Sequence, residues 1–205
     1  MAVKKTITYT AVDLGLKSGT KWASTNIGAN SEEEFGLYFQ FGSTSGYSGP
    51  DVIDHDTWTS YEPNNNEGEY NKDNIGKWDK TNVSSSCLNA DADAATVIMG
   101  EEWHLPTRAQ IKELISGTVQ EVTSMNNIEG VKFINKLDAE IYIFIPFSGY
   151  YIGNLFGNGY AGADIWGGSI QKQGSQYAYS LHIYGGDCSL CNSDRCYGYC
   201  MRGCQ

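Results

Sequence analysis

Six cysteines are the side chains of this sequence whose type and spacing could do chemistry. Five of them fall in one C-terminal stretch, where a Cys-x-x-Cys pair is followed by three more. Thiolates bind zinc, but zinc ribbons and fingers usually separate two such pairs by about a dozen residues or more. We therefore predict no metal site. Disulfide-bonded, metal-bound and free states all stay open for Cys188, Cys191, Cys196, Cys200 and Cys204.

One tripeptide has the chemistry of a calcium site. Glu62-Pro63-Asn64 matches a sugar-binding tripeptide of calcium-dependent lectins, and carboxylate and amide oxygens are the ligands that calcium prefers. In those lectins the tripeptide lies late in the domain, whereas more than half of this chain follows it. Because Pro-Asn also marks a turn, we predict no calcium-dependent sugar binding here. Asp91-x-Asp93 lacks the other ligands of a calcium loop and is more typical of a helix start.

The three histidines do not complete a catalytic constellation. His55, His104 and His182 form no recognisable triad with a serine or a cysteine. The sequence therefore predicts no catalytic residue, no cofactor and no enzymatic activity.

The stretch from Tyr177 to Cys200 has the composition of a recognition surface. It holds no Lys, Glu, Gln, Met or Trp, and changing the first two bases of an asparagine codon AAY can produce every residue in it. A mutagenesis system that rewrites adenines would leave this footprint. Tyrosine supplies large amphipathic contact area, and small polar residues add adaptable hydrogen bonds. The predicted ligand-binding residues are Tyr177, Ser180, His182, Tyr184, Asp187, Ser189, Asn192, Asp194, Tyr197 and Tyr199.

Charge and composition limit the kinds of partner that this chain can bind and the places where we expect to find it. The net charge of −10 would repel a phosphate backbone, and no basic stripe is present, so we predict no nucleic-acid binding. The most apolar run, 141–147, is too short to span a membrane, so we predict no membrane insertion. No apolar segment follows the lysines near Met1, so we expect no signal peptide. This favours a virion protein, such as one in a phage tail, over a cell-surface protein whose leader was removed.

The N-terminal half predicts short elements. Residues 12–27 alternate apolar and polar side chains about a Ser-Gly turn, which predicts a β-hairpin. Ser31 with Glu34 forms the pattern of a capping box, which predicts a short helix ending at Gly36. The aromatic run 37–41 should be buried. Residues 43–90 have little periodicity, so we expect a packed loop region there.

The second half predicts two helices and several strands. We expect a short helix at 91–99 and a more secure one at 108–115, with Thr107 and Gln110 as capping box. In 177–184 the period is two, so Tyr179, Leu181 and Ile183 share one face. Ser180, His182 and Tyr184 share the other, which we expect to face outward. The predicted strands are 131–134, 141–146, 162–166, 177–184 and the C-terminal run.

These motifs, in this order, resemble the major paralogous domain family (FISUMP) of gut bacteria and their phages. The resemblance spans nearly the whole chain and rests on five segments. These are Val12-Asp-Leu-Gly-Leu-x-Ser-Gly-Thr-x-Trp-Ala, Glu33-Glu-Phe-Gly-x-Tyr-Phe, Asp93-Ala-Ala, Trp103-x-Leu-Pro-Thr and Ile145-Pro-x-x-Gly-Tyr150.

The resemblance implies an α+β fold. It would be the C-type-lectin-like fold of the formylglycine-generating-enzyme-like branch, with short helices around small antiparallel sheets and much irregular loop. It also implies a single domain over 1–205, with 165–205 as the variable ligand-binding region. The family's C-terminal pattern is kept at Trp166, Leu181, Ile183, Arg195, Gly198 and Arg202. We expect the two arginines to be structural, since an Arg can fork onto backbone carbonyls or a carboxylate.

Residues between these kept positions depart from the pattern. The variable proteins of diversity-generating retroelements use this fold in that way, which implies a non-catalytic binder of a bacterial surface protein or glycan, for phage receptor binding or adhesion. A homo-oligomer would add avidity. Two alternatives stay open. One is a static secreted adhesin or lectin. The other is a formylglycine-generating-type thiol oxidase, whose cysteine pair would be Cys191 and Cys196. Such thiols need a lowered pKa, and adjacent Arg195 points to the opposite face of a strand.

Overall fold

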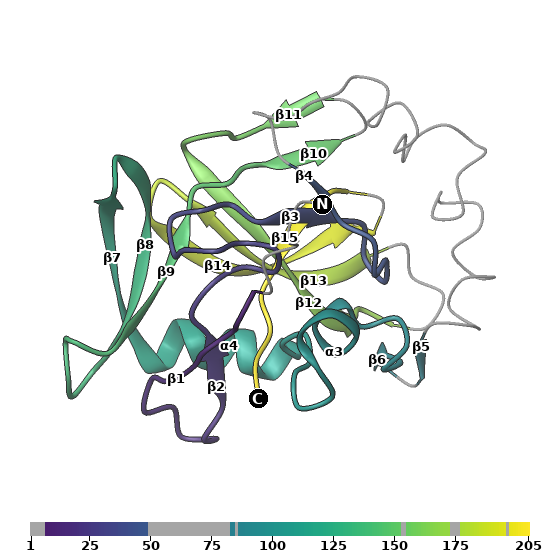
Figure 1. Cartoon of the computed structure of the whole chain (residues 1–205), viewed down its shortest axis with the longest axis horizontal. Helices are drawn as coiled ribbons and strands as arrows, with labels where there is room; N and C mark the ends of the chain where they lie inside the picture. The colour runs from purple at the N-terminus through teal and green to yellow at the C-terminus, as the bar shows by residue number, and fades with distance from the viewer. Residues whose placement is uncertain (1–6, 49–82, 85, 153–154, 173–176, 196) are drawn as a thin grey trace, which may run out of the picture.

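The computed structural model describes residues 7–48, 83–84, 86–152, 155–172, 177–195 and 197–205. These residues form a small α+β fold that is mostly β-sheet with two short helices, as predicted at this coarser level (Figure 1). The helices are α3 (Ala94–Met99) and α4 (Arg108–Gly117). Neither of these described helices is long and apolar enough to cross a membrane.

The largest sheet collects strands from both ends of the chain. Its main path runs β14-β13-β12-β15-β3-β4, and β6 with β5 adds to the far end of β12. The C-terminal strand β15 lies parallel to β12 and antiparallel to β3, so it joins the two halves of the sheet. The bounds are β3 (Leu37–Phe39), β4 (Tyr47–Ser48), β5 (Val83–Ser84), β6 (Cys87–Leu88), β12 (Gly162–Ile170), β13 (Tyr177–Tyr184), β14 (Asp187–Asp194) and β15 (Tyr199–Met201).

Three smaller groups of strands surround this sheet. Strands β7, β8 and β9 form an antiparallel sheet that stands beside it, and α4 runs below both (Figure 1). Strands β1 and β2 form one two-stranded ribbon, and β10 and β11 form another. The bounds are β1 (Ala11–Asp13), β2 (Lys21–Ala23), β7 (Thr118–Met125), β8 (Ile128–Asn135), β9 (Tyr142–Pro146), β10 (Tyr150–Ile152) and β11 (Leu155–Gly157).

Apolar side chains fill both sides of the large sheet. One cluster joins α4 and the β7-β8-β9 sheet to one face through buried residues such as Ile111, Leu114 and Phe133. A second cluster centres on Trp166 and Met201 on the other face. Strand β12 is buried along its whole length because both clusters cover it. The large sheet is therefore the middle layer, and its β13–β14 edge carries exposed polar side chains.

Most of the predicted elements are confirmed. The first hairpin is the β1–β2 ribbon, whose turn closes at Gly19 with a backbone bond to Leu16 of 2.9 Å. Helix α4 begins at the predicted capping box of Thr107 and Gln110. Asp93 caps α3, as expected of a helix start. The five predicted strand regions are all present, and Tyr38, Phe39 and Phe41 are buried as expected.

The helix predicted after Ser31 is wrong. The segment forms a turn, in which the Glu34 N–H donates to the Ser31 carbonyl at 3.3 Å. The Glu34 carboxylate accepts from the Asn30 N–H at 2.7 Å, so a capping interaction exists without a helix behind it. Gly36, with φ of +79°, then turns the chain at once into β3. Most of the predicted packed loop at 43–90 lies outside the described residues.

A glycine pair lets α4 approach the large sheet. A Cβ on Gly167 would lie 2.7 Å from the Pro106 carbonyl oxygen and 2.8 Å from the Ile111 side chain. The Gly168 N–H donates to the same Pro106 carbonyl at 2.9 Å. The β12–β13 register shifts between Trp166 and Ile170, so the bulge and the helix start meet at this pair.

Candidate functional site

The β13–β14 hairpin has two chemically different faces. The strands pair in one continuous register from Tyr184 with Asp187 to Tyr177 with Asp194. Side chains alternate along each strand, so paired residues share a face. Leu181, Ile183 and Leu190 lie on the face that packs into the core beside α4. We call the opposite face the polar hairpin face; it consists of Ala178, Ser180, His182, Tyr184, Asp187, Ser189, Cys191 and Ser193.

Exposure increases along the polar hairpin face toward the hairpin turn. At one end, the Ser180 and Ser193 hydroxyls lie 3.0 Å apart and both side chains are buried. At the other end, Tyr184 is 54% exposed opposite the exposed Asp187. His182 and Ser189 form the pair between them. The face therefore has a rigid buried end and an open end that can contact a partner.

A buried carboxyl group supports the middle of this face. His182 Nδ1 lies 3.0 Å from Asp164 Oδ1, and Asp164 is only 3% exposed in β12. Burial raises the pKa of Asp164, while its hydrogen bond to His182 opposes that shift. The same hydrogen bond raises the pKa of His182. The pair therefore holds the imidazole in one orientation and favours its charged form.

Aromatic rings border the polar hairpin face on the β15 side. The Tyr199 ring stacks on Trp166 with centroids 4.4 Å apart, and it lies 5.7 Å from Tyr150 and 6.0 Å from Tyr197. Burial raises the pKa of Tyr199, and the charge of Asp164 adds to that effect. The Tyr199 phenol is therefore a neutral group in this cluster, and Tyr197 and Tyr150 continue the aromatic surface outward.

The structure divides the ten predicted ligand-binding residues into groups. Ser180, His182, Tyr184, Asp187 and Ser189 come together on the polar hairpin face. Tyr197 and Tyr199 lie in the aromatic group beside it. The remaining three lie on the opposite face of the hairpin, together with Tyr179; they are Tyr177, Asn192 and Asp194. The Tyr179 ring lies 4.9 Å from the Arg108 guanidinium of α4.

The expectation that Ser180 faces outward is wrong. Its side chain is fully buried against Ser193, because the second apolar cluster extends under this end of the hairpin. Tyr199 is likewise buried, at 4% exposure, under the neighbouring rings. The sequence analysis missed Asp164, Cys191, Ser193 and Tyr150. Asp164 had a visible signal, since it is a carboxyl group inside an otherwise apolar strand.

Burial restrains the chemistry of three of the described cysteines, Cys188, Cys200 and Cys204. Cys87, Cys188, Cys191, Cys200 and Cys204 are free thiols. Burial raises the pKa of Cys188 to about 11 and that of Cys200 to about 12, and it also raises the pKa of Cys204. Thiols with raised pKa values are poor nucleophiles at neutral pH. The described residues contain no group of three potential metal ligands.

Several predicted chemical groups lie outside the described residues. They are Cys196, the second thiol of the considered cysteine pair, together with His55 and Glu62-Pro63-Asn64. His104 is described, and its Nε2 lies 3.4 Å from the buried Cys204 thiol and within 3.3 Å of the Gln110 amide.

Arg202 has the structural role that was predicted for it. Its side chain is fully buried and donates to Asn26 Oδ1 at 2.9 Å and to the Phe144 carbonyl at 2.8 Å. Burial lowers the pKa of its guanidinium, and the nearby Glu32 opposes that shift. Arg195 is also buried, with its guanidinium 5.4 Å from the Phe41 ring centroid. Both arginines are therefore buried parts of the described structure.

Comparisons of the chain with protein-family models, with curated proteins and with solved structures found no match.

Proposed function

We propose that this chain is a non-catalytic ligand-binding protein that displays a diversified C-terminal surface on a C-type-lectin-like fold. In this proposal it is the variable protein of a diversity-generating retroelement, and its partner is a bacterial surface protein or glycan. Its place is a phage virion, where it binds a receptor, or a cell surface, where it acts as an adhesin.

The observation that carries this proposal is the separation of displayed and framework positions within one hairpin. His182, Tyr184 and Ser189 lie on the polar hairpin face, while alternate residues between them are buried apolar framework. Substitution of Tyr184 or Ser189 changes a surface without removing core contacts, and surface substitutions usually change stability by less than about 0.5 kcal/mol. A binder that varies its surface needs this arrangement.

The chemistry of the face also suits recognition. Tyr184, Asp187 and Ser189 offer an aromatic ring, a carboxylate and a hydroxyl at its open end. His182 is held by Asp164, and the rings of Tyr150 and Tyr197 extend the surface toward β10. Rigid aromatic anchors combined with small polar groups are typical of adaptable protein-binding surfaces.

The genomic test is to sequence the DNA that flanks the coding region. The proposal expects a reverse transcriptase gene and an imperfect repeat of the codons for residues 165–205 that differs only at adenines. Such a repeat would also identify the contact positions directly. A locus with neither element contradicts diversification and leaves a static binder or adhesin.

A protein-level test compares two libraries on the same hairpin. The first randomises Tyr184, Asp187 and Ser189 with codons ending in a pyrimidine; the matched control randomises the fully buried Leu181 and Ile183 and the partly buried Leu190. Both libraries are displayed on yeast, sorted for protease resistance and then panned on purified bacterial surface proteins and glycans.

We expect most members of the first library to stay folded and some to gain new ligands, whereas the control library loses folded members because it removes core contacts. Equal loss of folding in both libraries would contradict the proposal, since the displayed positions would then be structural. A folded first library without any new binder would contradict the binding role itself.

A further inference from the structure

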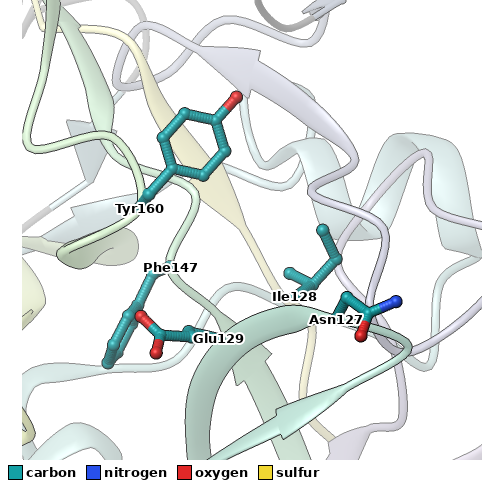
Figure 2. Close-up of a pocket in the computed structure, with 5 residues that line it drawn as sticks. All are labelled: Asn127, Ile128, Glu129, Phe147 and Tyr160. Atoms are coloured by element: carbon teal, nitrogen blue, oxygen red, sulfur yellow. The ribbon is translucent and has the colours of Figure 1, made fainter.

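A hollow of about 310 Å³ lies on another part of the molecule. Asn127, Ile128, Glu129, Phe147 and Tyr160 line it (Figure 2). The first three come from the β7–β8 turn and the start of β8, Phe147 follows β9, and Tyr160 precedes β12. Three separate chain segments therefore build this hollow, and none of its lining residues belongs to the polar hairpin face.

Glu129 is an exposed residue near the start of β8. It lies opposite Phe147, whose N–H donates to the Glu129 carbonyl at 2.8 Å and continues the β8–β9 ladder. It shares the odd-numbered face of β8 with the buried Val131 and Phe133. The hollow is therefore lined by an exposed carboxylate and by the Phe147 ring, both labelled in Figure 2.

Tyr160 is held in a strained backbone conformation at the rim. Its φ is +67°, a left-handed conformation that bulky residues rarely adopt. Its N–H donates to the Phe147 carbonyl at 3.3 Å, and its ring centroid lies 6.3 Å from that of Phe35. The ring is nevertheless 60% exposed. Strain of this kind persists where surrounding structure enforces it and is concentrated at functional sites.

The opposite rim is also fixed. Asn126 and Asn127 both have positive φ and form the two-residue turn between β7 and β8. The Asn126 amide donates to the Glu33 carboxylate at 2.7 Å, which ties this turn to the chain before β3. A rim held in place in this way reduces the conformational entropy that the protein would lose when a ligand binds.

The hollow carries an acidic group that has no cationic partner among the described residues. The ion pair between Asp164 and His182 does not involve Glu129. The nearest lysine in the strand, Lys132, lies over another ring, with its ammonium 3.8 Å from the Tyr142 ring centroid. A cationic ligand would therefore meet the Glu129 carboxylate without competition from a described side chain.

We propose that this hollow binds a lysine or arginine side chain of a protein partner. The aliphatic stem packs against Ile128 and Phe147, and the charged head lies between the Glu129 carboxylate and the Tyr160 ring. A cation near an aromatic face gains cation–π attraction, and a carboxylate adds charge-assisted hydrogen bonds. The net charge of −10 attracts a basic partner surface and repels an acidic one.

The test is a titration of the full chain, followed by amide NMR shifts, with the peptides acetyl-Gly-Lys-Gly-amide and acetyl-Gly-Arg-Gly-amide. The neutral peptide acetyl-Gly-Gln-Gly-amide is the control ligand. We expect both basic peptides to shift the amides of 127–130, 147 and 160 in a saturable way with a Kd of about 1–10 mM, and the neutral peptide to cause none of these shifts.

Two variants test the assigned groups. Glu129→Gln should weaken binding of the basic peptides about fivefold, while Glu121→Gln, an exposed change of equal charge in the same hairpin, should leave it unchanged. Tyr160→Asn keeps a residue that tolerates positive φ, so the fold survives while the ring is removed, and it should weaken binding by a similar factor.

Equal shifts with the glutamine peptide, or equal weakening by Glu129→Gln and Glu121→Gln, would overturn the proposal. So would an absence of shifts at the hollow with either basic peptide. The polar hairpin face takes no part in this binding, so a negative result at the hollow would leave the proposed recognition function intact.

Discussion

Asp164 and His182 show how single residues decide the character of the polar hairpin face. Asp164 carries a carboxyl group buried in β12, and its cross-strand partner on β13 is His182. The imidazole gives the buried carboxyl group a hydrogen-bond partner, and the carboxyl group orients the imidazole. Strand periodicity alone predicted the face on which His182 lies. It could not predict the partner, because pairing between β12 and β13 depends on register across a loop.

Stability should fall with rising pH because of this pair. The pKa of His182 is raised above its usual 6.5, so its contribution is fully present below pH 6.5 and is lost as pH rises through the raised pKa. The raised pKa of Asp164 acts in the same direction, since the folded state holds that proton more tightly. Asp164→Asn should reduce the pH-dependent part of the free energy of unfolding by about 1 kcal/mol. The effect is small because solvent screens the partly exposed His182.

The measurement is chemical denaturation of both proteins from about pH 5 to about pH 9, with the His182 ring followed by NMR. The wild-type free energy of unfolding should decline above pH 6.5 more steeply than that of the variant. Parallel curves, or a His182 pKa that Asp164→Asn does not lower, would contradict the assignment.

At the scale of elements, short-range patterns were informative where a residue's neighbours decide its conformation. The capping box at Thr107 and the alternation in β13 both appear as expected. The same capping pattern at Ser31 produced only a turn, because Gly36 redirects the chain into β3 before a helix can extend. A capping motif is a local signal, whereas helix length depends on packing.

Truncation of two adjacent residues of β13 should change the free energy of unfolding by very different amounts. Ile183 is fully buried and Tyr184 is 54% exposed, because successive side chains of a strand point to opposite faces. Ile183→Ala should lower the free energy of unfolding by about 2–5 kcal/mol. Tyr184→Ala should change it by less than about 0.5 kcal/mol. Urea denaturation measures both, and similar values for the two variants would contradict the alternation.

At the scale of the whole molecule, Arg202 connects parts that are distant in sequence. Its guanidinium donates to Asn26 and Phe144 and, at 3.4 Å, to the Ala23 carbonyl. It therefore fixes the end of β15 to the first ribbon and to β9. Together with the central position of β15, this contact makes the last residues of the chain part of its core rather than a tail.

Removing this contact should destabilise the molecule strongly. Arg202→Met keeps an apolar stem but leaves the acceptors at Asn26, Ala23 and Phe144 buried without their donor, which costs about 1–3 kcal/mol for each group left unsatisfied. Arg108→Met, at an exposed position of α4, is the matched control and should cost less than about 1 kcal/mol. Thermal and urea unfolding measure the difference, and equal effects would show that Arg202 is not structurally central.

The sequence by itself determined the local elements, the polar character of the C-terminal stretch and the two faces of β13. It could do so because helix caps, turns and strand alternation depend on residues close together along the chain. The tertiary structure decided which polar positions are displayed. Ser180 and Tyr199 are buried, and Tyr177, Asn192 and Asp194 lie on the other hairpin face, because register and the second apolar cluster set exposure. It also assembled the Glu129 hollow from segments far apart in sequence, which no local pattern encodes.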